Sequence, residues 1–122
     1  MENSLKTAVY DVLTTALSVT VHNGAKLNSE LPFVDIDDYS STDWSTKTYT
    51  GDRAELRIHV WHADRDVCAA IMSQIRTALD RVELTVVGFN FVDGQYRSSR
   101  SITDADGVTF HGMVDFEFLV HS

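Results

Sequence analysis

The sequence has one cysteine, Cys68, and one proline, Pro32, among its 122 residues. A single cysteine cannot close an internal disulfide, which excludes a cross-linked scaffold and fits a reducing compartment. No uninterrupted apolar run approaches the roughly 20 residues of a membrane-spanning helix, so we expect no membrane partner. The first residues lack the basic-then-apolar layout of a secretory signal, and we expect synthesis in a cytosol.

Positively charged residues are also scarce, since 10 Lys and Arg stand against 18 Asp and Glu and the formal net charge is −8. Proteins that grip nucleic acid neutralise its phosphates with clustered Lys and Arg. The nearest approach to such a cluster is Arg97 with Arg100, for which we expect solvated positions or local salt bridges. The charge balance therefore argues against a nucleic-acid-binding protein.

Motifs that carry chemistry are missing as well. There is no G-x-S-x-G, P-loop or dinucleotide-binding glycine pattern, so we expect no enzyme activity and no cofactor. Asp35, Asp37 and Asp38 lack the glycine and terminal Glu of a calcium loop, and we expect a solvated strand end. His59 and His62 are expected to point to opposite faces, which is poor geometry for one metal ion. A metal-dependent enzyme using a histidine-bearing sheet face is the weaker alternative. The histidines are His22, His59, His62, His111 and His121.

Residues 53–82 carry the clearest structural pattern. Ala54, Leu56, Ile58 and Val60 alternate with mostly polar residues, which predicts a strand with one buried face. After Asp64 the apolar period changes to three and four residues, which predicts a helix with Asp64 as its N-cap. The strand and the helix are expected to bury each other's apolar faces. The predicted apolar stripe of the helix is Val67, Cys68, Ile71, Met72, Ile75, Ala78, Leu79 and Val82.

The N-terminal part predicts another helix, a strand and a loop. The helix is expected over residues 5–19 with Asn3 or Ser4 as its cap. A turn and a polar loop lead to a short strand opened by Pro32, with Phe33 among its buried residues. The predicted segments after the helix are a loop at 25–31, a strand at 32–38 and a surface loop at 39–50.

The C-terminal part predicts strands and a long hairpin. The predicted features are a strand at 84–92 with a bend at Gly88, a register slip near Asp93-Gly94, a turn at 103–107 and a strand at 108–120. The distal half of the last strand and its partner at 95–102 are polar enough to project as an arm. Residues 1–122 are thus expected to form one α+β domain: a mainly antiparallel sheet with two helices packed on one face and a long projecting β-hairpin.

Two parts of this predicted fold could meet a partner. The sheet face away from the helices is expected to carry His59, Trp61, His111, Met113 and Leu119 among charged residues, a mixture that suits burial against another subunit. The alternative is a solvent-exposed surface that carries these side chains but meets no partner. In the loop at 39–50, Trp44 either folds back on the body or anchors an interface.

Four segments, taken in order, resemble a known family: LPFV at 31–34, DWSTK at 43–47, HVW at 59–61 and DGVTFHG at 106–112. They are similar to the tail-completion, or tail-terminator, proteins of tailed bacteriophages and of phage-derived gene transfer agents, over essentially the whole chain. The resemblance implies a structural virion protein that forms a ring, most often a hexamer, at the head-proximal end of the tail tube. The tail tube protein and the head-tail connector, or stopper, protein would be its partners, and DNA would pass through the lumen without specific binding.

A ring closed by head-to-tail contacts needs two different adhesive surfaces on each subunit. The loop around Trp44 and the sheet face around Trp61 are the candidates. A small cytosolic oligomeric adaptor with no role in a virion is the alternative. The predicted subunit-interface residues are Trp44, Lys47, Arg57, His59, Trp61, Arg97, Arg100, His111 and Met113.

Overall fold

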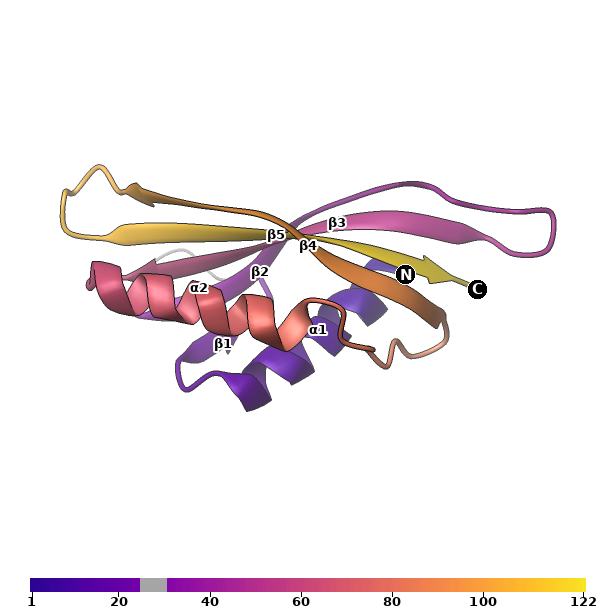
Figure 1. Cartoon of the computed structure of the whole chain (residues 1–122), viewed down its shortest axis with the longest axis horizontal. Helices are drawn as coiled ribbons and strands as arrows, with labels where there is room; N and C mark the ends of the chain where they lie inside the picture. Colours follow the sequence, from indigo (N-terminus) through magenta and orange to yellow (C-terminus); the bar gives the residue numbers. More distant parts are fainter. Residues whose placement is uncertain (25–30) are drawn as a thin grey trace.

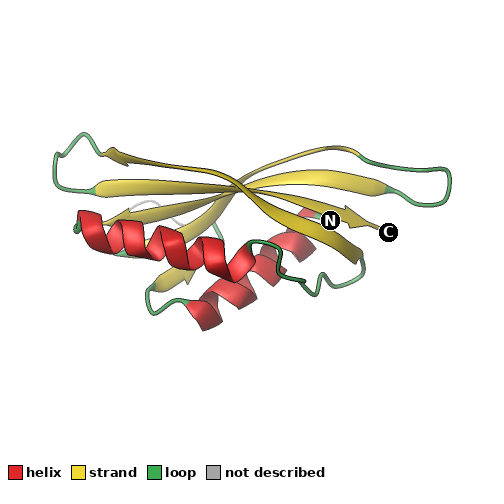
Figure 2. Cartoon of the chain, viewed as in Figure 1, coloured by secondary structure: helices red, strands yellow, loops and turns green. Residues whose placement is uncertain are grey.

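A computed structural model describes residues 1–24 and 31–122, and most of the loop predicted at 25–31 lies outside these residues. In this part of the chain the sheet order is β1-β2-β3-β5-β4, and every neighbouring pair is antiparallel except β1 with β2. Both helices lie against one face of the sheet (Figures 1 and 2), which confirms the predicted α+β class. The elements are α1 (Glu2–Ala16), β1 (Thr20–His22), β2 (Phe33–Asp43), β3 (Gly51–His62), α2 (Arg65–Leu79), β4 (Asn90–Thr103) and β5 (Phe110–His121).

The strand and helix predicted over 53–82 are confirmed as β3 and α2. The four alternating apolar residues of β3 are at most 1% exposed, and Cys68 on α2 is equally buried. Asp64 caps α2, because its carboxylate accepts hydrogen bonds from the backbone N–H groups of Asp66 and Val67. Val67 and Val82 are exposed, contrary to prediction, since the buried stripe of α2 uses Cys68 and later positions and ends with the helix at Leu79.

The helix α1 is shifted toward the N-terminus relative to the prediction. It begins at Glu2 with Met1 as an N-cap that makes no side-chain hydrogen bond, so the predicted caps Asn3 and Ser4 are wrong. Leu17 is already extended, because the β-branched residues that follow lead directly into β1. Neither helix in the described part of the chain is long and apolar enough to cross a membrane.

The strand predicted at 84–92 is wrong for residues 84–89. Residues 82–89 form no strand, although Leu84 and Val86 are at most 4% exposed. They pack into the core as a covering segment rather than as a rung of the sheet. Gly88 makes the predicted bend, with a positive φ of 84°. Two register shifts, at Val92 and at Arg97, replace the single slip expected near Asp93-Gly94.

The hairpin of β4 and β5 is present, but projection of its distal half beyond the core is not confirmed. Gly112, near the start of β5, lies directly over α2, where an added Cβ would come within 2.5 Å of Met72 Sδ and 3.3 Å of Cys68 Sγ. The predicted loop at 39–50 is also shorter than expected. β2 continues to Asp43 after an irregularity at Asp38, because pairing with β3 supplies the hydrogen bonds that its polar composition does not reveal.

Candidate functional site

The outer face, defined here as the sheet face away from the helices, holds every predicted interface residue except Trp44 and Lys47. Strand register places Trp61 of β3 opposite His111 of β5 and Phe33 of β2. The next row places His59 opposite Met113, which in turn faces Arg100 of β4. The predicted shared face of β3 and β5 is thereby confirmed, and the structure brings its members into contact.

An aromatic cluster occupies one end of the outer face. The rings of Trp61 and His111 stack with centroids 3.6 Å apart and planes 13° apart. Phe33 stacks beside Trp61 at 6.2 Å, and His22 meets Phe33 edge-on at 5.5 Å. Phe33 was expected in the core and is indeed only 9% exposed, but it is buried on the outer face. The sequence alone could not predict that Phe33 lies on the same sheet face as Trp61, because that depends on the register between β2 and β3.

A chain of hydrogen bonds runs from this cluster toward β2. Nε2 of His59 donates to Oδ2 of Asp38 at 3.0 Å, and Nδ1 of His59 lies 2.8 Å from Nε2 of His111. When Nε2 of His59 is the donor to Asp38, Nδ1 is placed to accept from the Nε2–H of His111. Burial, followed by the neighbouring His59, lowers the pKa of His111 and keeps this ring neutral to lower pH.

These histidines bond to each other rather than converge on an ion. Among the described residues, no group of three or more His, Cys, Asp or Glu side chains could hold a metal. Asp35, expected in a solvated strand end, is instead only 7% exposed and accepts a hydrogen bond from Gly24 N–H at 2.9 Å. Burial raises the pKa of the Cys68 thiol, which disfavours the thiolate that a nucleophile would need.

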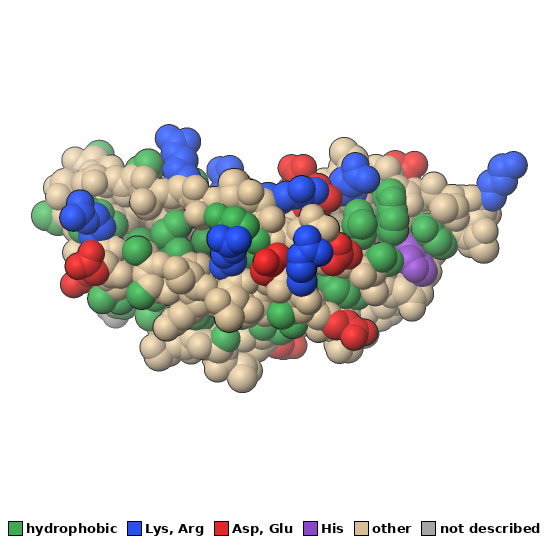
Figure 3. Space-filling view, viewed as in Figure 1, with side chains coloured by type: hydrophobic (Ala, Val, Ile, Leu, Met, Phe, Trp, Pro, Cys, Tyr) green, Lys and Arg blue, Asp and Glu red, His purple; other side chains and the backbone are tan. Residues whose placement is uncertain are grey.

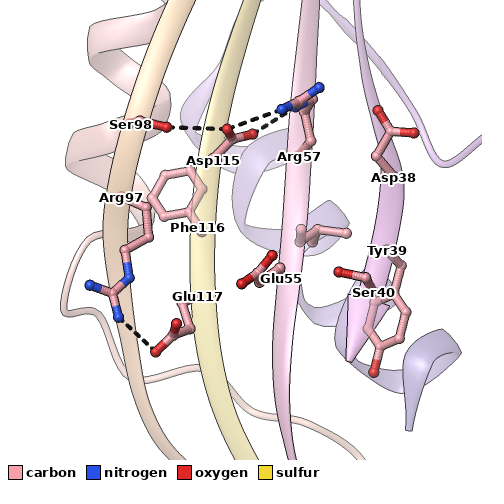
Figure 4. Close-up of a pocket in the computed structure, with 11 residues that line it drawn as sticks. Asp38, Tyr39, Ser40, Glu55, Arg57, Arg97, Ser98, Asp115, Phe116 and Glu117 are labelled. Carbon is pink, nitrogen blue, oxygen red and sulfur yellow. Dashed lines mark hydrogen bonds and ion pairs between the residues drawn. The ribbon is translucent and has the colours of Figure 1, made fainter. Parts of the chain in front are cut away.

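The middle of the outer face is an open polar groove (Figure 4). Arg57 donates two hydrogen bonds to Asp115, at 2.8 and 3.3 Å, and this contact raises the pKa of Arg57. Ser98 also donates to Asp115, at 3.2 Å, and Arg97 pairs with Glu117 at 2.8 Å. The expected local salt bridge of Arg97 is thus present. The groove satisfies most of its charges within the monomer.

The loop that carries Trp44 lies at the opposite end of β3 from Trp61. Trp44 N–H donates to Gly51 O at 2.8 Å, and the half-buried indole packs against the Gly51 backbone. The ring centroid of Tyr49 lies 6.1 Å from that of Trp44, and Tyr49 stacks on His121 with ring centroids 4.1 Å apart. Lys47 is exposed. The indole therefore folds back on its own hairpin while keeping part of its surface open, and the structure does not bring it near Trp61.

The fold and sequence together place the chain in a class of phage structural proteins. The family model "Tail completion protein gp17" matches residues 7–121, and the chain belongs to this family. A curated relative, tail completion protein gp17 of Bacillus phage SPP1, is 36% identical over 92 residues, which are 75% of this chain and 69% of the relative. The predicted resemblance to the tail-completion family is thus confirmed, and this family is one of structural proteins rather than enzymes.

Two solved structures are similar to this chain. The structure of SPP1 gp17 superposes with a TM-score of 0.63 at 29% identity, covering 95% of this chain and 88% of the other. A chain in the virion of a native gene transfer agent particle superposes with a TM-score of 0.87 and covers 99% of this chain and 97% of its own. At 17% identity the second likeness shows a shared fold.

Proposed function

We propose that this protein is a virion component that closes the head-proximal end of a phage or gene transfer agent tail tube. Copies assembled in the cytoplasm of the host bacterium form a closed ring of six, stop tube polymerisation and join the tube protein to the head-tail connector or stopper protein. Membership of the tail-completion family carries this proposal. The nine predicted interface residues supply its contacts.

The arrangement of surfaces supports a ring. Head-to-tail closure requires two different contact surfaces on one subunit. Trp61 and Trp44 lie near opposite ends of β3, and each is partly exposed. Trp61 stacks on His111, and Trp44 lies beside the tilted ring of Tyr49. The two sites do not overlap, so one subunit can engage two neighbours at once.

The charge of the chain supports a conduit that DNA crosses without binding. Six copies at −8 each would carry a formal charge of about −48. A negative lumen repels phosphates at short range, because the Debye length is roughly 8 Å at physiological salt. In Figure 3, the Lys and Arg side chains on the visible face are scattered among acidic ones and form no continuous stripe. Tight binding of duplex DNA by purified rings at physiological salt would contradict this point.

The direct test replaces Trp44 or Trp61 with Ala and compares each variant with Val87→Ala. Val87 is 76% exposed and lies outside both candidate surfaces, so it is a control for loss of an apolar side chain. We expect all three proteins to fold, judged by circular dichroism. Rings seen by native mass spectrometry, or caps seen on tail tubes by electron microscopy, should be lost only in the Trp variants. A stable dimer that never caps a tube would favour the adaptor instead.

A further inference from the structure

The sheet has an unpaired edge on each side, because no described strand lies beyond β4 on one side or beyond β1 on the other. β4 pairs with β5 along one side only, over its whole length. On the other side of the sheet, β1 pairs with β2 only from Phe33 to Asp35. Residues 36–43 of β2 pair with β3 along one edge and have no strand on their other edge within the described chain. Long unpaired edges are templates for adding another strand, and most proteins keep them short or covered.

The distal half of β4 is open on more than its edge. All seven residues 97–103 are exposed, whereas a strand on a covered sheet alternates buried and exposed positions. Both faces and the outer edge of this segment are therefore accessible, and its pairing with β5 holds it in place. Residues 40–43 of β2 are likewise all exposed. These two segments lie on opposite sides of one sheet.

The two edges carry opposite charge. From Ile36 to Asp43, β2 contains three aspartates and no Lys or Arg. From Gln95 to Thr103, β4 contains Arg97 and Arg100 and no carboxylate. Pairing β2 with β2, or β4 with β4, would set like charges side by side, which is unfavourable across strands. Pairing β4 with β2 sets opposite charges side by side. The charges therefore favour a head-to-tail contact over a two-fold one.

The strand directions agree with such a contact. Along the sheet, β2 and β3 are antiparallel, as are β3 and β5, and β5 and β4, so β4 runs opposite to β2. Rotation about a ring axis keeps the sense of each strand when the sheet continues from one copy to the next. The β4 edge of one copy would then meet the β2 edge of its neighbour as an antiparallel pair, the arrangement with the better hydrogen-bond geometry.

We propose that the exposed half of β4 in one copy adds to the free edge of β2 in the next copy, so that the sheets join around the ring. This inference rests on the proposed ring and names its contact. It also links the two candidate surfaces, since Ile102 of β4 pairs with His111 beside Trp61, and β2 ends at Asp43, next to Trp44. A second copy of this chain is the partner because it alone is certain to supply the complementary edge.

Cross-linking between two variants, each with one introduced cysteine, tests the contact. Ser40→Cys and Ser99→Cys place thiols on the two exposed edges, in the register that also brings Asp37 near Arg100, and the native Cys68 is buried. The two proteins are mixed, assembled, and treated with a short bismaleimide. We expect cross-linked heterodimers in the mixture and neither variant to cross-link alone. Gln74→Cys, exposed on α2, replaces Ser40→Cys as the matched control and should give no product with Ser99→Cys.

Charge reversal provides the second measurement. Asp37→Arg and Arg100→Glu alter exposed side chains, so both proteins should fold. Each single reversal should weaken assembly about 3- to 10-fold per contact, and the double variant should recover it. Rings that form normally but show neither the cross-link nor the rescue would overturn this contact and leave the proposed function standing. A wild-type protein that neither forms rings nor caps tail tubes would overturn both.

Discussion

Trp61 and His111 form a face-to-face stack at 3.6 Å because β3 and β5 pair them directly across the sheet. Stacking against the indole covers one side of the imidazole, and Nε2 of the same imidazole is held by His59. The ring is thus partly withdrawn from water, which disfavours its charged form. This contact ties a titratable group to the surface on which we place assembly.

Lowering the pH should therefore destabilise the fold through His111. Because the pKa of His111 is lowered from 6.5 in the folded chain, the unfolded chain binds more protons between the two values. The contribution of the neutral ring is complete above about 6.5 and is lost as the pH falls through the folded-state pKa. In His111→Phe, which keeps a ring for Trp61, the drop in urea midpoint between about pH 7.5 and about pH 5.5 should be smaller than in the wild type. Equal drops would contradict the assignment.

Removing the cap of α2 should cost stability without touching the outer face. Asp64 satisfies two backbone N–H groups of the first helical turn, at 2.9 and 3.0 Å. We expect Asp64→Ala to lower the free energy of unfolding by about 0.5–2 kcal/mol, measured by urea denaturation. Glu83→Ala removes an exposed carboxylate away from any helix start and should change it by less than about 0.5 kcal/mol. A cap variant as stable as this control would show that the capping bonds contribute nothing.

A methyl group on Gly94 should also be costly. An added Cβ would lie 2.8 Å from Cδ1 of Phe118, whose ring is fully buried and stacked on Phe116. The ring cannot yield without disturbing the core, so Gly94→Ala should lose about 1–3 kcal/mol. Ser99→Ala, on an exposed part of the same strand, is the control for strand propensity. Thermal and urea unfolding should rank the wild type and Ser99→Ala together, above Gly94→Ala.

The periodic parts of this fold could be predicted from sequence, and the parts fixed by pairing could not. Alternation in β3 and the stripe of α2 each depend on one segment, so local pattern was sufficient. The polar residues 39–43 became strand because β3 lies beside them, and Leu84 became core without joining the sheet. Neither outcome could be predicted from the residues of the segment itself, because each depends on a neighbouring part of the fold.

The candidate site shows the same division. The alternation of residues along each strand predicted that Trp61 and His111 share one face. Their stacking follows from the register between β3 and β5, which sets them directly opposite each other. The register of β2 likewise turned Phe33 from an expected core residue into a neighbour of Trp61. The two bulges of β4 decide which of its side chains join the outer face, and a bulge is set by the partner strand as much as by sequence.

Removing the ion pair between Arg57 and Asp115 should affect assembly more than the stability of the folded monomer. Their side chains are 42% and 32% exposed, and surface pairs of this kind contribute about 0–1 kcal/mol. Arg57→Ala should therefore shift the urea midpoint only slightly, since Asp115 keeps its hydrogen bond from Ser98. If the outer face meets another subunit, the same change should reduce ring formation well beyond its effect on folding, because an unpaired carboxylate is costly once covered. Native mass spectrometry at matched concentrations, with Arg65→Ala as an exposed-arginine control on α2, measures the difference. A variant that assembles as well as this control would remove the centre of the outer face from the interface.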